Sequence, residues 1–127
     1  MLSNCKWLSV LALASLLSAC GGGADPTARG AIAYDTSTKN GAISVNYASQ
    51  PEANSDALAK CGTAGCAVLL EFSGNGTCGA IAVASNGAWG VASGGSKELA
   101  DTRAVSDCLK RGGGVCVIPH GLETQCN

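Results

Sequence analysis

The sequence has few of the side chains on which catalysis and metal binding depend. It contains one histidine, one phenylalanine, two tyrosines and two tryptophans, and only 13% of its 127 residues are charged. The single histidine, and cysteines that nowhere follow Cys-x-x-Cys spacing, argue against a zinc site and against a redox motif. The nucleophile motif G-x-S-x-G is also missing. We therefore expect no enzymatic activity, no cofactor and no metal.

Residues 1–19 are organised as an export signal. Lys6 supplies a weakly positive start, and the apolar run over 7–17 is shorter than the roughly 20 residues that a bilayer-spanning helix requires. The run leads into the sequence LSAC at 17–20, which matches the bacterial lipoprotein signal. We expect cleavage before Cys20 and lipid attachment to its sulfur; an ordinary signal peptide with a chance cysteine is the alternative.

Charge and the residues around Cys20 limit the partners of the mature chain. Loss of Lys6 leaves seven basic residues against nine acidic ones, a net charge of −2 that argues against a nucleic-acid partner. The glycine-rich stretch 20–28 predicts a flexible tether behind the lipid on Cys20, which makes the membrane an expected partner. Because Gly21 is not an aspartate, we expect a lipid-anchored protein of the bacterial cell envelope, at the outer membrane, facing the periplasm or the surface.

Residues 29–127 are expected to form one domain from two similar halves, 29–78 and 79–127. The tetrad GAIA begins at Gly30 and again at Gly79, and further motifs recur at similar offsets. Each half has two strand-like segments, then a helical pattern, then a third apolar segment. The pattern predicts an α+β fold in which two pseudo-repeated β-β-α-β units form a two-layer, disulfide-stabilised domain of about six strands and two helices.

Capping residues predict where the two helices begin and end. Ser49 can cap a first helix that stops at Gly62, and Ser96 or a neighbour can cap a second helix that stops at the glycines 112–114. We expect the apolar faces of these helices to include Leu58 and Leu109.

Turn residues and apolar runs predict the strands. The segments 39–41 and 86–87 carry the Asn-Gly pairs that favour hairpin turns, one in each half. The continuous apolar run over 67–72 is typical of a central strand, and 115–118 is expected to supply a closing strand.

Six cysteines remain once Cys5 leaves with the signal and Cys20 is acylated, and an even number in an exported domain indicates disulfides. Six cysteines allow 15 connectivities, and a swapped pairing stays open. The arrangement that respects the internal repetition pairs Cys61 with Cys66, Cys108 with Cys116, and Cys78 with Cys126.

Three aromatic side chains are candidates for binding a partner, namely Trp89, Tyr34 and Tyr47, which lie in the two expected hairpins. Their alternative role is to fill the core of a domain with few large side chains. His120, the only histidine, has Glu123 nearby and would be the centre of a small hydrolase site. A lone loop histidine is more often merely solvated.

Several motifs resemble a family of exported bacterial proteins classified as domain of unknown function 4189. The resemblance covers about residues 29–127. Its motifs are the segments 30–34, 52–61, 78–82, 86–90 and 108–116, and Cys66 before an apolar strand. Glycines 94–95 depart from the family's usual residues, which puts a shared binding edge there in doubt. Members of the family have no assigned activity, so the resemblance implies no catalytic residue.

These observations favour a non-enzymatic envelope module that binds a protein or a glycan. An inhibitor or immunity protein is the sharper form of this hypothesis, because a small tethered lipoprotein is suited to intercepting an incoming enzyme. A purely structural envelope protein and, less favoured, a small hydrolase are the alternatives.

Overall fold

The computed structural model describes residues 27–127, so the expected signal peptide, Cys20 and most of the tether lie outside the described residues. No helix within 27–127 is long and apolar enough to span a bilayer. The first half contains β1 (Arg29–Tyr34), β2 (Gly41–Tyr47), α2 (Gln50–Cys61) and β3 (Ala67–Ser73). The second contains β4 (Cys78–Ala84), β5 (Trp89–Gly94), α3 (Lys97–Lys110), β6 (Cys116–Val117) and β7 (Gln125–Cys126). The α+β class and both helices are confirmed, and β7 is a strand that the sequence pattern did not indicate.

The strands form two antiparallel sheets, one from each half of the chain. In the first sheet the order is β2-β1-β3, and in the second β4 pairs with β5 on one side and with β6 and β7 on the other. The prediction of a central strand over 67–72 was wrong, because β3 lies at an edge. The run is apolar because α2 covers one face of the strand and the second sheet covers the other.

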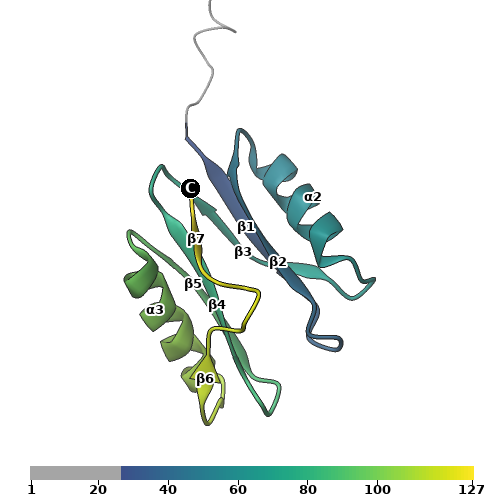
Figure 1. Ribbon diagram of the computed structural model, residues 1–127, viewed down its shortest axis with the longest axis vertical. Helices are drawn as coiled ribbons and strands as arrows, with labels where there is room; N and C mark the ends of the chain where they lie inside the picture. The colour runs from purple at the N-terminus through teal and green to yellow at the C-terminus, as the bar shows by residue number, and fades with distance from the viewer. Residues whose placement is uncertain (1–26) are drawn as a thin grey trace, which may run out of the picture.

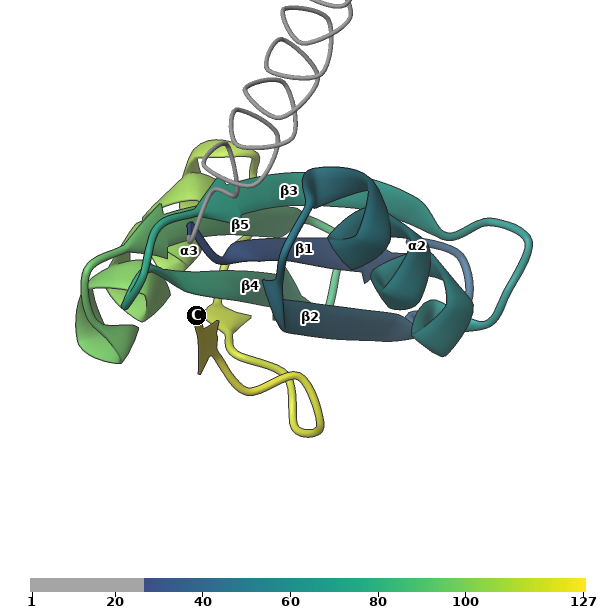
Figure 2. The same cartoon turned by 90° about the horizontal axis from the view of Figure 1, so that it is seen from above.

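The two sheets pack face to face between the two helices, which gives four layers instead of the expected two (Figure 1). In β1, Ala31 and Ala33 contact α2, while Ile32 belongs to the cluster between the sheets. In β4, Ala80 and Ala82 face α3 and Ile81 faces the first sheet. Each central strand is therefore buried on both faces. The view from above shows the two helices on opposite sides of the strands (Figure 2). The two-layer prediction failed because it assigned each sheet only one covered face.

The repeated GAIA tetrad has a physical basis in this packing. Gly30 of β1 and Gly79 of β4 both lie against the ring of Phe72, so a Cβ on either glycine would overlap the ring. Phe72 is the only phenylalanine of the chain and is 4% exposed. The two glycines thus make room for one aromatic ring between the sheets.

Small residues line the face that each helix packs on its sheet. The buried residues of α2 are Ala53, Ala57 and Cys61, and α3 repeats the pattern. Leu58 and Leu109 are 38% and 47% exposed, so the prediction that they belong to the apolar faces was wrong. Alanines at the contact bring the helix axis close to the sheet, which leaves the longer side chains at the margins.

The expected caps are confirmed. The Ser49 hydroxyl accepts from the backbone N–H of Glu52, and Gly62 ends α2 in a left-handed conformation with φ 82°. The Ser96 hydroxyl accepts from the N–H of Leu99 at the start of α3.

Gly90 of β5 lies directly against the backbone of α3. A Cβ at this position would meet the backbone of α3, including the carbonyl oxygen of Ala104 at 2.5 Å and the backbone nitrogen of Cys108. The register places Gly90 opposite Ala82, and the corresponding partner of Ala33 in the first sheet is Ala42. At this position α3 therefore packs on the backbone of Gly90, whereas α2 packs on the methyl group of Ala42.

The three disulfides join the pairs that the internal repetition favoured. Two of them connect the end of a helix to the segment that follows it, with sequence separations of 5 and 8 residues. The third joins Cys78 in β4 to Cys126 in β7 over 48 residues.

Candidate functional site

The structure does not bring the three candidate aromatic residues together. Tyr34 is 6% exposed and lies in the cluster between the sheets. Tyr47 packs at the margin of the cluster under α2, and the guanidinium of Arg111 lies 4.2 Å from the centre of the Trp89 ring at the other helix. The three residues thus face three different layers, and they do not form one aromatic surface.

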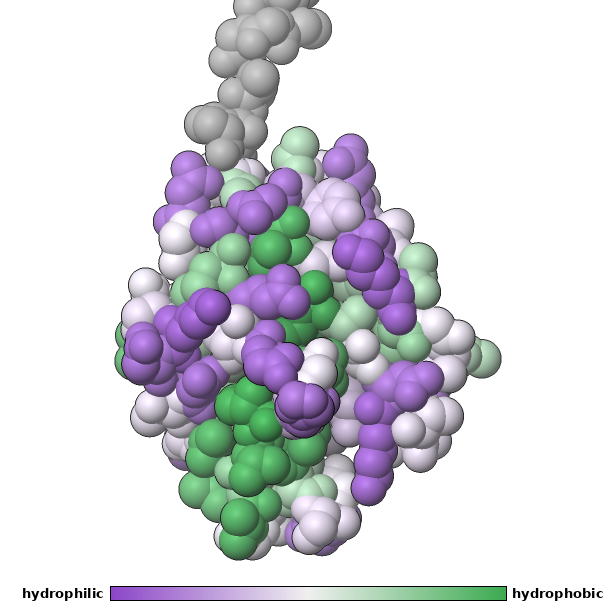
Figure 3. Space-filling view, in the orientation of Figure 1, coloured by the Kyte–Doolittle hydropathy of each residue, from purple (hydrophilic) through white to green (hydrophobic). Residues whose placement is uncertain are grey.

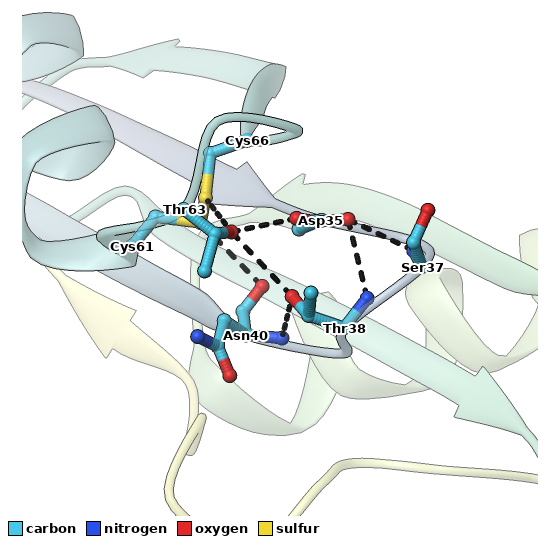
Figure 4. Close-up of a disulfide and its surroundings, with 7 residues drawn as sticks. All are labelled: Asp35, Ser37, Thr38, Asn40, Cys61, Thr63 and Cys66. Carbon is cyan, nitrogen blue, oxygen red and sulfur yellow. Dashed lines mark hydrogen bonds between the residues drawn. A yellow bond between two sulfur atoms is a disulfide. The ribbon is translucent and has the colours of Figure 1, made fainter.

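A polar cluster surrounds the Cys61–Cys66 disulfide (Figure 4). The carboxylate of Asp35, 3% exposed, accepts hydrogen bonds from the Thr63 hydroxyl at 2.6 Å and from the backbone N–H groups of Ser37 and Thr38. Together these hydrogen bonds lower the pKa of Asp35 to about 2, and the bond from Thr63 contributes most to the shift. Every contact here is internal, so the cluster fixes the β1–β2 loop against the turn after α2.

A second acidic cluster joins α2 to β2. The carboxylate of Asp56 accepts from the Ser44 hydroxyl at 2.5 Å and lies 2.9 Å from the ammonium of Lys60. These two interactions lower the pKa of Asp56 to about 2, and the hydrogen bond from Ser44 contributes most to the shift. The Asp56 carboxylate in turn raises the pKa of Tyr47 through a hydrogen bond. Ser44 is buried, at 2% exposed, so its hydrogen bond to Asp56 anchors the helix to β2.

His120 and Glu123 lie side by side, as the hydrolase hypothesis requires. The imidazole Nδ1 is 3.5 Å from a Glu123 carboxylate oxygen, and the backbone N–H of Gly121 also donates to that carboxylate. The histidine side chain is fully exposed. Within residues 27–127 neither side chain hydrogen-bonds to a hydroxyl or a thiol, so the described geometry places no nucleophile beside them.

A hollow of about 170 Å³ is lined by the end of β1, the β1–β2 loop, the end of β4 with the turn that follows it, and β6. Figure 1 shows these segments at the end of the molecule opposite the start of β1. Tyr34 enters it from the first sheet, and Val83 and Val117 from the second. Lys39, in the loop between β1 and β2, lies at its edge. The hollow is thus a continuation of the core between the sheets that no side chain of the described part fills.

Apolar surface continues from this hollow onto β6. Val117 is 55% exposed and Val115, just before the strand, is 76% exposed. The space-filling view shows hydrophobic residues gathered over this part of the molecule (Figure 3). Exposed apolar residues that adjoin a hollow are typical of a contact surface.

A second, more polar depression of about 330 Å³ lies beside the first. Its lining includes Lys39, Asn40, Lys60 and His120. The ammonium of Lys60 is already paired with Asp56, and the imidazole of His120 lies beside the carboxylate of Glu123.

Lys39, Val83 and Val117 are not among the site residues that the sequence predicts. Tyr34 was the only lining residue of the apolar hollow among the candidates. Val115 and Val117 were assigned to an ordinary closing strand, and no local pattern signals that such a strand lies beyond the edge of the opposing sheet. Lys39 has no signal in the sequence either; only the structure shows its left-handed backbone, with φ 65°, in the loop at the edge of the hollow.

The fold and its disulfides define a class of protein, a disulfide-bonded α+β domain with two antiparallel sheets between two helices. Multiple disulfides indicate an extracytoplasmic protein. The chain belongs to the family described as Domain of unknown function (DUF4189), whose family model matches residues 30–122. Comparison with curated proteins and with solved structures finds no match. The family membership confirms the resemblance seen in the sequence and assigns no activity.

Proposed function

We propose that this protein is a non-enzymatic binding module of the bacterial cell envelope, anchored by lipid on Cys20 and recognising a protein or a glycan. The observation that carries the proposal is the apolar hollow between the sheets, which continues into the exposed valines of β6. This surface lies at the end opposite the start of β1 (Figure 1). A tether that precedes β1 would hold the surface away from the membrane.

The length of the tether is consistent with such an orientation. Residues 20–28 form a glycine-rich linker, and about nine residues of flexible chain span roughly 15–18 Å. The β strands add about 20 Å more, since each residue of a strand rises about 3.3 Å. The module would therefore present the hollow to partners in the periplasm or at the cell surface, with the outer membrane as its site of attachment. An inhibitor or immunity protein is the specific form of this proposal.

Metabolic labelling with palmitate tests the anchor. Wild-type protein is expected to incorporate label, and Cys20→Ser is expected to abolish it. Cys5→Ser lies within the expected signal and is the matched control, so it should leave the label unchanged. Label that persists in Cys20→Ser would overturn the lipid anchor.

Affinity capture from an envelope extract tests the binding function. The full chain carrying Cys20→Ser, purified with its disulfides intact, is compared with the same protein after reduction and alkylation. A partner retained only by the oxidised protein supports the proposal, and a single enriched enzyme supports the inhibitor form. An empty capture with both forms favours a purely structural role.

The hydrolase alternative rests on the proximity of His120 and Glu123. His120→Ala is the discriminating variant, because a general base at this position would be lost. If the variant retains every phenotype of the wild type, the hydrolase alternative is excluded.

We also propose that the two halves are pseudo-repeated copies of one β-β-α-β unit. The shared element order and the placement of a disulfide after each helix support this. The test is superposition of the halves in a crystal structure, where the strands and helices should align in one register. A register that differs by one residue would place Ala33 and Ala82 on opposite faces and overturn the proposal.

A further inference from the structure

We propose that the apolar hollow binds the last residue of an extended peptide, with an aliphatic side chain inside the hollow and the terminal carboxylate at Lys39. The inference deepens the binding function given above and rests on it. It assigns a chemical class to the partner, a protein segment that ends in a free carboxylate after an aliphatic residue.

The floor of the hollow favours an aliphatic group. Tyr34 and Val83 belong to the cluster between the sheets, and Val117, which pairs with Val83, also lines the hollow. The volume of about 170 Å³ is below the roughly 300–1,000 Å³ of pockets that enclose a whole drug-sized ligand. A single side chain therefore suits the hollow better than a large ligand, and it would bury apolar surface that water now contacts.

The edge of the hollow favours a carboxylate. Lys39 is exposed, and no carboxylate of the described residues lies within ion-pair distance of its ammonium. The nearby Asp35 is fully engaged by the Thr63 hydroxyl and by backbone N–H groups of the same loop. Thr36 and Ser85 also line the hollow and supply hydroxyl donors. A bound carboxylate would thus meet one cation and two hydroxyl groups.

The neighbouring strand favours a peptide over a free small acid. β6 is at the end of its path through the second sheet, so its outer edge has no strand partner in the part of the chain that the structure describes. An unpaired edge can accept an extended segment through backbone hydrogen bonds. Val115 and Val117 leave apolar surface along this edge. The edge, the hollow and Lys39 together match the backbone, the last side chain and the terminal carboxylate of one extended peptide.

Nuclear magnetic resonance titration tests the inference. The probes are acetyl-Ala-Ala-Leu with a free carboxylate, the same peptide as its amide, and 4-methylpentanoate, added to the ¹⁵N-labelled full chain carrying Cys20→Ser. The free-acid peptide should shift the amide signals of 36–39, 83–88 and 115–118. The amide should bind about tenfold or more weakly, since a charge-assisted contact is lost.

Two variants test the contact with the carboxylate and the contact with the aliphatic side chain separately. Lys39→Asn removes the charge and keeps a residue that tolerates positive φ, so the loop should fold normally and the free acid should bind no better than the amide. Its matched control is Lys97→Asn on α3, which should bind as wild type. Val117→Asp should abolish binding, whereas Leu99→Asp, at a similarly exposed apolar residue away from the hollow, should not.

The inference is overturned if the amide binds as tightly as the acid, if Lys39→Asn binds as wild type, or if the shifts map elsewhere. Binding of 4-methylpentanoate as tightly as the peptide would assign the hollow to a small acid and would also overturn it. If no probe binds but envelope capture still retains a partner, the inference fails and the proposed function stands. If capture is empty as well, both fail.

Discussion

The two halves of the molecule attach a helix to a sheet in the same way but complete the sheet differently. In both, an Ala-Ala-Cys face packs on the central strand and a disulfide follows the helix. The first half then adds β3, seven residues that pair along the whole of β1. The second adds only the two residues of β6 and, after a loop, the two of β7. The second sheet is therefore closed along a much shorter stretch of its central strand than the first.

The two halves also differ in where their polar anchors and exposed apolar side chains lie. The fully paired half also contains the two aspartates whose pKa values are lowered to about 2, and both bind their own elements. The incompletely paired half supplies Val115 and Val117, which are exposed. The buried polar anchors therefore lie in the first half and the most exposed valines in the second, while both halves contribute residues to the hollow between them.

The largest expected effect tests how closely the two helices approach their sheets. Gly90→Ala should destabilise the protein by more than about 4 kcal/mol, because the new methyl group meets backbone atoms of α3 that cannot move independently. The reciprocal change in the first half, Ala42→Gly, should cost only about 1 kcal/mol. Denaturant unfolding of both variants measures the difference. Similar values for the two would mean that the helices approach their sheets equally closely.

The disulfides should rank by the length of chain that each closes. Replacing both cysteines by alanine should cost about 4 kcal/mol for Cys78–Cys126, about 2.5 for Cys108–Cys116 and about 2 for Cys61–Cys66, because a longer loop has more unfolded-state entropy to lose. Melting temperatures of the three double variants test the order. Equal losses would show that strain or local contacts, not loop length, control their contribution.

Acid should weaken the first half through Asp35 and Asp56. Both folded-state pKa values lie near 2, below those of the unfolded chain, so their stabilisation is present above about pH 4 and is lost as the pH falls through about 2. Asp35→Asn should therefore reduce the dependence of stability on pH in this range by about half. Urea unfolding between pH 5 and pH 2 measures it. The exposed Glu98→Gln on α3 is the control, and an equal effect there would contradict the assignment.

The smallest expected effect concerns the margins of the helices. Leu58→Ser and Leu109→Ser should each cost only about 1 kcal/mol, because each side chain is about half buried. Ala57→Leu, one residue from Leu58 but fully buried, should cost about 1–3 kcal/mol by overpacking. Thermal unfolding of the three variants distinguishes margin from contact face. A loss of stability in either serine variant as large as that of Ala57→Leu would mean that the leucine belongs to the packed face of its helix.

Local features of the fold could be predicted from the sequence. Ser49, Gly62 and Ser96 mark the helix ends through short-range hydrogen bonds and a left-handed turn, which nearby residues determine. The recurrence of the cysteines was sufficient to favour the observed pairing among 15 connectivities.

The arrangement of layers could not be predicted, because it depends on contacts between distant segments. The alternation of Ala31, Ile32 and Ala33 gives two apolar faces, but small and large residues do not reveal that one face receives a helix and the other a sheet. The hollow depends in the same way on Tyr34 and Val117, which meet only after the sheets have packed. The sequence pattern of one strand does not indicate where the opposing sheet ends.

The central position of β1 also determines how the domain would respond to mechanical load. The carbonyl of Ala28, just before the strand, accepts from the backbone N–H of Gly74 and from the side chain of Asn127. Beyond it, β1 is held by β2 on one side and by β3 on the other. A force on the chain ahead of Ala28 would pull β1 along its own axis and shear two rows of hydrogen bonds together. A domain pulled from this end would resist extraction of its first strand far better than one attached through an edge strand.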